Sequence, residues 1–137
     1  MSLQSDPKVL TFNINWQIAP VKSQILNFML TIPSTFYRHD LFEDSEFDNQ
    51  YAFKGCILFS GAHYQAMFRQ FNSPEWTVYD DDLTRTKQSW GETIEFCLES
   101  NTYPTVLFFE KVEFDTMEIE LSLDEIKKLL LSTKELE

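Results

Sequence analysis

The sequence predicts an α+β fold, an antiparallel sheet with flanking helices. Apolar residues recur with period two in several segments of the 137-residue chain and with helical spacing in others, and these are the patterns of half-buried strands and of amphipathic helices. The chain has 13 Phe, 5 Tyr and 3 Trp but only 3 Gly and 5 Pro, which favours a packed core over disorder. This length fits one domain or one half of a larger one.

The amino-terminal third is predicted to hold one strand and one helix. Apolar residues alternate with polar ones from Leu10 to Ile18, which indicates a strand. After Pro20, apolar residues recur with helical spacing, which predicts a helix with Pro20 in its first turn and Pro33 at its end. A strand in this segment is the alternative. The residues with this spacing are Val21, Ile25, Phe28, Met29 and Ile32. The acidic stretch from Ser34 to Gln50 is interpreted as a loop.

An antiparallel meander is predicted for the middle of the chain. Its three strands run from Tyr51 to Phe59, from His63 to Phe68 and from Glu75 to Tyr79, and turn signals separate them. In the second strand, alternation places His63, Gln65 and Met67 on one face. The first residues of this strand and the last residues of the third therefore lie at the same edge of the sheet.

Two helices and one strand are predicted for the carboxy-terminal part. Within Thr84 to Ser100, an amphipathic helix is indicated by Trp90, Ile94, Cys97 and Leu98. Pro104 to Val112 is strongly apolar and reads as a strand. Ser122 and Glu125 have the spacing of a capping box, which predicts the start of a last helix.

The net charge of −11 makes nucleic acid an unexpected partner, because phosphate binding needs clustered Lys and Arg. An acidic surface suits a basic protein or peptide ligand. Alternatively, the acidic charge serves only to keep the protein soluble. No apolar run approaches 20 residues, and no amino-terminal apolar signal is present. The sequence therefore predicts no membrane partner.

The cysteine and histidine content predicts neither a disulfide framework nor a metal site. Cys56 and Cys97 are the two thiols, as expected in a reducing compartment such as the cytoplasm or nucleus. Two thiols cannot hold zinc alone, and the two histidines are not at a recognisable ligand spacing. No cofactor is expected.

His63 and Asp80 are the candidate site. The meander brings the two side chains to one edge of the sheet, where the carboxylate can accept a hydrogen bond from one ring nitrogen and leave the other able to take a proton. In enzymes with a cysteine or serine nucleophile, a histidine of this kind is the general base and the carboxylate orients its ring. Asp81 and Asp82 extend the acidic cluster. Alternatively, His63 is a surface turn residue and the three aspartates form a solvated loop.

An ordered series of motifs resembles the carboxy-terminal half of the ubiquitin-specific protease family. The segments that carry the resemblance are Leu10–Pro33, Tyr51–Phe59, the histidine box Ser60–Ala66, the double-aspartate segment Trp76–Asp81 and the closing strand Thr105–Phe109. The resemblance covers residues 8–112, and residues 113–137 form an acidic strand and helix extension. The helix from Ser89 onwards is most similar to divergent members of the family thought to be inactive.

The resemblance implies a papain-like fold and a deubiquitinating site. His63 would be the general base for a cysteine nucleophile, Asp80 would orient it, and Asp81 would assist as a second carboxylate. Tyr64 and Gly61 would lie beside the channel that admits the Gly-Gly tail of ubiquitin. The implied reaction is hydrolysis after that tail through a thioester.

Two departures from the family pattern bear on activity. Ala62 stands where the family has Gly before the histidine, and no cysteine box is present. Cys56 lies in a predicted strand and Cys97 on the apolar face of a predicted helix, so both are expected to be buried and inert. The chain is therefore expected to be inactive alone. Three interpretations remain: a site completed by a cysteine-box-bearing segment, a non-catalytic module that binds ubiquitin, a ubiquitin-like protein or another protein, and a plain structural domain.

Overall fold

The computed structural model describes residues 7–41, 49–61, 63–70, 73–112 and 123–136. Within these ranges, the chain forms one antiparallel sheet with three α-helices and one short 3-10 helix. The predicted α+β class, an antiparallel sheet with flanking helices, is confirmed. None of the helices in these ranges is long and apolar enough to cross a membrane.

The sheet has seven strands in the described part of the chain, with the spatial order β1-β7-β3-β4-β5-β6 and with β2 added to β3. Their bounds are β1 Val9–Asn13, β2 Thr35–Tyr37, β3 Gln50–Ser60, β4 His63–Arg69, β5 Trp76–Asp80, β6 Leu83–Lys87 and β7 Tyr103–Lys111. Every pairing is antiparallel. The predicted meander is present as β3, β4 and β5, and β3 lies near the middle of the sheet.

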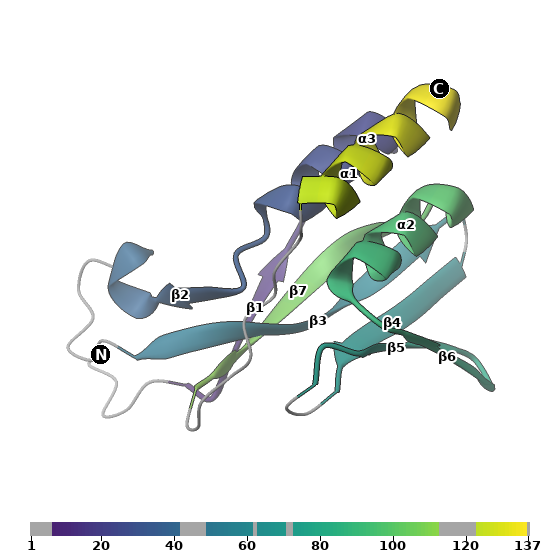
Figure 1. Cartoon of the computed structure of the whole chain (residues 1–137). Helices are drawn as coiled ribbons and strands as arrows, with labels where there is room; N and C mark the ends of the chain where they lie inside the picture. The colour runs from purple at the N-terminus through teal and green to yellow at the C-terminus, as the bar shows by residue number, and fades with distance from the viewer. Residues whose placement is uncertain (1–6, 42–48, 62, 71–72, 113–122, 137) are drawn as a thin grey trace.

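The three helices are α1 Lys22–Thr31, α2 Trp90–Ser100 and α3 Leu123–Leu136. They contact one another and lie together on one side of the sheet (Figure 1). α3 belongs to the same core as α1 and α2, because Leu129 is only 2% exposed within it. The predicted helices before Pro33 and after Ser122 are therefore confirmed, while the proposed cap at Ser122 falls outside the described residues.

The core lies between the sheet and the helices and is rich in aromatic rings. Phe53 from β3, Trp76 from β5 and Trp90 from α2 have ring centroids 4.8 to 5.3 Å apart, and Phe53 also contacts Phe109 of β7. Phe53 and Trp76 are each 1% exposed. These contacts join three strands to α2 and fix the helix layer over the sheet.

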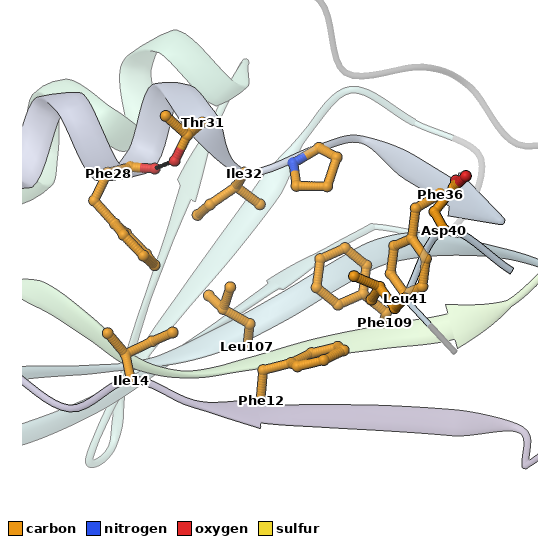
Figure 2. Close-up of a pocket in the computed structure, with 11 residues that line it drawn as sticks. Phe12, Ile14, Phe28, Thr31, Ile32, Phe36, Asp40, Leu41, Leu107 and Phe109 are labelled. Carbon is orange, nitrogen blue, oxygen red and sulfur yellow. Dashed lines mark hydrogen bonds between the residues drawn. The ribbon is translucent and has the colours of Figure 1, made fainter. Parts of the chain in front are cut away.

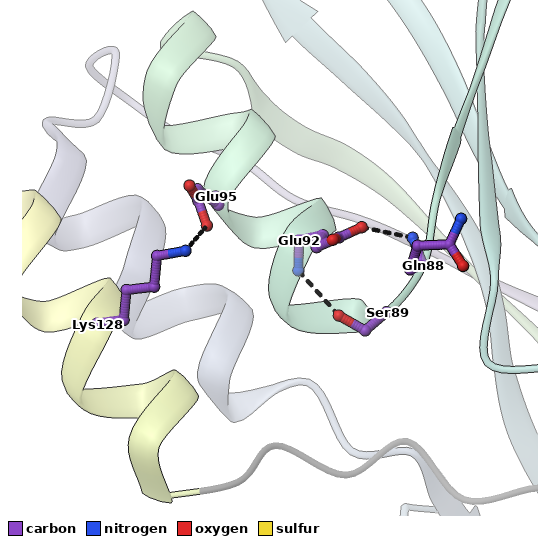
Figure 3. A network of polar contacts seen from close by, with 5 residues as sticks. All are labelled: Gln88, Ser89, Glu92, Glu95 and Lys128. Carbon is purple, nitrogen blue, oxygen red and sulfur yellow. Dashed lines mark hydrogen bonds and ion pairs between the residues drawn. The ribbon is translucent and has the colours of Figure 1, made fainter.

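α2 begins and ends at well-defined caps. Ser89 Oγ accepts a hydrogen bond from Glu92 N at 3.2 Å, and the Glu92 carboxylate accepts one from Gln88 N at 2.6 Å (Figure 3). This satisfies two amide groups at the helix start. Asn101 ends the helix in a left-handed conformation with φ 54°, which Asn tolerates better than most residues.

An ion pair joins two of the helices: Lys128 of α3 pairs with Glu95 of α2 at 3.4 Å.

The first strand is shorter than predicted. β1 ends at Asn13 instead of continuing to Ile18, which is 83% exposed. The Ile14 amide still donates to the Thr105 carbonyl at 2.8 Å, but at Trp16 the side-chain indole donates to β7, to the Pro104 carbonyl at 2.8 Å. The strand therefore ends although the alternation of apolar residues continues.

Three other predictions differ from the structure in their bounds. The stretch Ser34 to Gln50 is not all loop, because it contains β2, a 3-10 helix at Arg38–Asp40 and the first residue of β3. The helix expected within Thr84 to Ser100 starts only at Trp90, and Leu83–Lys87 forms β6 instead. Pro20 precedes α1 and its cap residue Val21, so it is not in the first turn.

Candidate functional site

Two hairpin turns meet at one edge of the sheet. Gly61, in the left-handed region with φ 62°, lies between β3 and β4, and Ser60 pairs with His63. β5 and β6 are joined by Asp81 and Asp82, and Asp80 pairs with Leu83. Since β4 and β5 are antiparallel, the start of β4 and the end of β5 lie at the same edge.

The strand register places His63 and Asp80 on the same face. Ala66 pairs with Tyr79, so continuing this ladder puts Gln65 opposite Asp80 and makes His63 the diagonal neighbour of Asp80, within reach of a long side chain. This face is the helix-covered one, because Trp76 and Val78 share it with Asp80 and are buried in the core. The site thus lies on the core-facing side of the sheet, at the end where that side becomes exposed to solvent.

His63 Nε2 and Asp80 Oδ1 are in direct contact. The His63 side chain is 46% exposed and that of Asp80 is 24% exposed. With Nε2 held by the carboxylate, Nδ1 is the ring atom that can take a proton from a reacting group. The contact predicted from the sequence is therefore present, while the catalytic roles of the two residues stay predictions.

Asp81 adds a second carboxylate to the pair. One ligand atom from each of His63, Asp80 and Asp81 lies within 4.8 Å of the others. The backbone of Asp81 is left-handed, with φ 53°, a conformation that Asp adopts more readily than most residues. Asp81 also raises the pKa of His63, although less than Asp80 does.

The charged form of His63 is stabilised by its surroundings. The hydrogen bond to Asp80 and then the charge of Asp80 raise the pKa of His63 above its ordinary value of 6.5. Because the pKa is higher in the folded state, the stabilisation is fully present below about pH 6.5 and is lost as the pH rises through the folded-state pKa. The folded surroundings of His63 thus favour the imidazolium over the neutral ring.

Asp80→Asn is expected to lower the pKa of His63, because asparagine cannot supply the carboxylate charge. Titration of the histidine ring carbon-bound protons by NMR measures this directly. His39 is the internal control, since its partner at 3.2 Å is Asp40 and its titration curve should not move. An unchanged His63 pKa in the Asp80→Asn variant would contradict the contact.

Tyr64 does not join the pair. Successive side chains of a strand point to opposite faces, and Tyr64 packs against Phe59 with ring centroids 4.6 Å apart on the face away from His63. Its side chain is exposed, and so is Gly61. Ala62 falls outside the described residues. The substrate-binding roles implied for Tyr64 and Gly61 stay predictions.

Both thiols are buried. Cys56 and Cys97 have no exposed surface. Burial raises the pKa of Cys56 well above its usual range, and burial raises the pKa of Cys97 to about 12. Since the thiolate is the nucleophile, neither residue is suited to attack a carbonyl at neutral pH.

We expect the folded protein to resist alkylation at both cysteines. Iodoacetamide should leave the intact mass unchanged at neutral pH, whereas the same protein in guanidinium chloride should gain two adducts. Rapid modification of either residue in the folded state would show that its thiol is accessible.

An apolar pocket lies at the other end of β3. It has a volume of about 310 Å³ and is lined by residues of β1, β7, the end of α1, β2 and the 3-10 helix and by residues next to them (Figure 2). Its apolar walls are Phe12, Ile14, Phe28, Ile32, Pro33, Phe36, Leu41, Leu107 and Phe109. Thr31 and Asp40 are its polar lining residues, and the Thr31 hydroxyl donates to the Phe28 carbonyl at 2.6 Å. This pocket was not predicted from the sequence, because its walls come from five separate segments.

The sheet and the helix layer form an α+β fold that is similar to a ubiquitin-hydrolase-like domain. One similar solved structure is that of the apo Pan2 pseudoubiquitin hydrolase-RNA exonuclease module from Saccharomyces cerevisiae, in complex with AACCAA RNA. The TM-score is 0.53 at 12% sequence identity, and the match covers 87% of this chain. At this identity, the likeness concerns the fold.

The present chain spans only 23% of the length of the Pan2 chain that it matches. No family model matches the sequence, and no curated protein matches it. The resemblance to the histidine-box half of the ubiquitin-specific proteases therefore stays a prediction at the level of that family. The expectation that nucleic acid is not a partner also stays a prediction.

Proposed function

We propose that the chain is the histidine- and aspartate-bearing part of a thiol-dependent deubiquitinating site whose cysteine comes from another segment or subunit. The observation that carries the proposal is the contact of His63 Nε2 with Asp80 Oδ1 at an exposed edge of a ubiquitin-hydrolase-like fold. His63 acts as general base through Nδ1, Asp80 orients the ring, and Asp81 favours the imidazolium. Residues 8–112 are the family-like unit, and the protein acts in the cytoplasm or nucleus.

Contact with ubiquitin is the first test. Isotope-labelled chain is titrated with ubiquitin, and backbone NMR resonances are followed. The proposal expects saturable shifts at Gly61, His63 and Asp80, which weaken when the ubiquitin lacks its last two glycines. Absence of any saturable shift at millimolar ubiquitin would overturn it.

The source of the nucleophile is tested with ubiquitin that carries a thiol-reactive group at its carboxy terminus. We expect no adduct with the isolated chain, because both thiols are buried. An adduct at Cys56 or Cys97 in the intact mass would place the nucleophile within this chain and overturn the half-site proposal.

A non-catalytic binding module is the second candidate function, and the apolar pocket is the observation that favours it. Its volume of about 310 Å³ lies at the lower end of ligand pockets and suits one large apolar side chain of a partner protein. Asp40 is the charged lining residue and the chain carries a net charge of −11, so the partner segment would be basic.

Two matched peptides test whether the pocket binds a basic partner segment. Two amidated hexapeptides, Gly-Ser-Leu-Lys-Gly-Ser and Gly-Ser-Leu-Glu-Gly-Ser, differ only in the charge next to the leucine. Binding at the pocket predicts larger NMR shifts of Phe36 and Leu41 with the lysine peptide, and Asp40→Asn should remove the difference. Equal shifts with both peptides would contradict a basic partner at this pocket.

A further inference from the structure

The cluster of His63, Asp80 and Asp81 contains a metal-ligand set that the sequence spacing does not reveal. His63 opens β4, whereas the aspartates close β5 and begin the next turn 17 residues later. The antiparallel pairing of β4 with β5 brings one imidazole nitrogen and two carboxylate oxygens within 4.8 Å of one another. The sheet, not local spacing, therefore assembles the set.

This donor set suits zinc. Zn²⁺ accepts imidazole nitrogen and carboxylate oxygen at about 2.0–2.2 Å, which in a tetrahedral site separates the ligand atoms by roughly 3.3–3.6 Å. The ligand atoms lie within 4.8 Å of one another, and the side chains that carry them are exposed or partly exposed, so rotation of the side chains can adjust their separation. An imidazole ligand favours zinc over magnesium or calcium, which prefer oxygen ligands alone.

The surroundings leave room for a fourth ligand. The His63 side chain is 46% exposed, and Asp81 and Asp82 lie in an exposed turn. Three protein ligands with one solvent-facing position is the arrangement of an open zinc site. Two carboxylates also balance the charge of a divalent cation.

We propose that His63, Asp80 and Asp81 bind Zn²⁺, with water in the fourth position. The metal takes the place of the His63–Asp80 contact at Nε2. Binding does not depend on the proposed deubiquitinating function. If that function holds, zinc regulates the same site negatively, because a ring that holds the metal at Nε2 carries its proton at Nδ1 and cannot act as a base there.

Isothermal titration of the untagged, folded chain with zinc chloride at pH 7 tests the proposal. We expect one zinc per chain, and at least tenfold weaker binding after Asp81→Asn. Asparagine keeps the left-handed turn accessible and leaves the His63–Asp80 pair intact, so this variant separates a three-ligand metal site from a simple pair. His63→Gln should abolish binding.

The chain supplies a matched control. His39 and Asp40 form a second exposed histidine–aspartate contact at 3.2 Å, but no third ligand group accompanies them among the residues that the structure describes. His39→Gln should leave zinc binding unchanged. Circular dichroism of each variant checks folding before titration.

Paramagnetic Mn²⁺ gives an independent location for the metal. It should broaden NMR signals of the β3–β4 and β5–β6 turns before those of the 3-10 helix at Arg38–Asp40. Two results would overturn the proposal: no saturable zinc binding up to millimolar concentration, or binding that Asp81→Asn and His63→Gln leave unchanged. Neither result depends on ubiquitin, so failure here is distinguishable from failure of the proposed function.

Discussion

Trp76→Ala destabilises the protein by about 3–5 kcal/mol, the range for removing a buried aromatic side chain. Trp76 is 1% exposed and its ring lies 5.3 Å from Phe53 and 4.8 Å from Trp90. Its removal opens a cavity and breaks the contact between β5 and α2. Since domains of this kind are stable by roughly 5–15 kcal/mol, this single change removes a large share of the stability.

Chemical denaturation followed by far-ultraviolet circular dichroism measures this loss, because tryptophan fluorescence changes with the substitution itself. Ile18→Ala is the control, since Ile18 is 83% exposed and surface changes usually stay within about 0.5 kcal/mol. A Trp76→Ala variant as stable as Ile18→Ala would mean that the three rings do not hold α2 on the sheet.

Gly55→Ala is expected to destabilise the protein by about 1–3 kcal/mol, the usual cost of overpacking. A Cβ at Gly55 would lie 2.4 Å from the Met67 carbonyl oxygen and 2.4 Å from Cδ1 of Phe68. The Met67 oxygen belongs to the backbone of the neighbouring strand and cannot move aside. Gly55 also lies at an irregularity in the pairing of β3 with β7, where glycine is common.

Gly61 provides the matched comparison for Gly55, because nothing lies within 4 Å of a Cβ built there but its φ is 62°. Alanine at Gly61 is strained by about 1–2 kcal/mol in this left-handed conformation, and Asn, which tolerates it, should restore part of the loss. At Gly55, Asn should be worse than Ala because the obstacle is space. Denaturant midpoints of the four variants test this, and rescue of Gly55 by Asn would contradict it.

The sequence predicted those elements of the fold that place apolar side chains in the core. β3, β4, β5 and α2 all do so, although β3 is buried on both faces from Tyr51 to Phe53. β6 escaped prediction because it is an edge strand exposed over most of its length, with no apolar alternation. β1 was predicted too long because the alternation of apolar and polar residues reflects side-chain burial. It carries no information on whether the backbone pairs with a neighbouring strand.

Part of the candidate site was predictable for a different reason. His63 and Asp80 flank two strands of one meander, so antiparallel pairing alone brings them to one edge. That Tyr64 points away from His63 also follows from strand alternation. The proposed zinc-ligand set was missed because metal motifs are recognised by short local spacings. The pocket was missed because distant segments converge on it.

The position of β1 in the sheet has a consequence for synthesis of the protein on the ribosome. Among the residues that the structure describes, β1 pairs only with β7, and partners such as Val9 and Glu110 are about 100 residues apart. At a translation rate of about 5–20 residues per second, β1 waits roughly 5–20 s before its partner strand is made. During that interval, the apolar side of β1 with Leu10 and Phe12 has no native strand beside it, so nascent chains are most vulnerable to aggregation and most dependent on chaperones before residue 111 emerges.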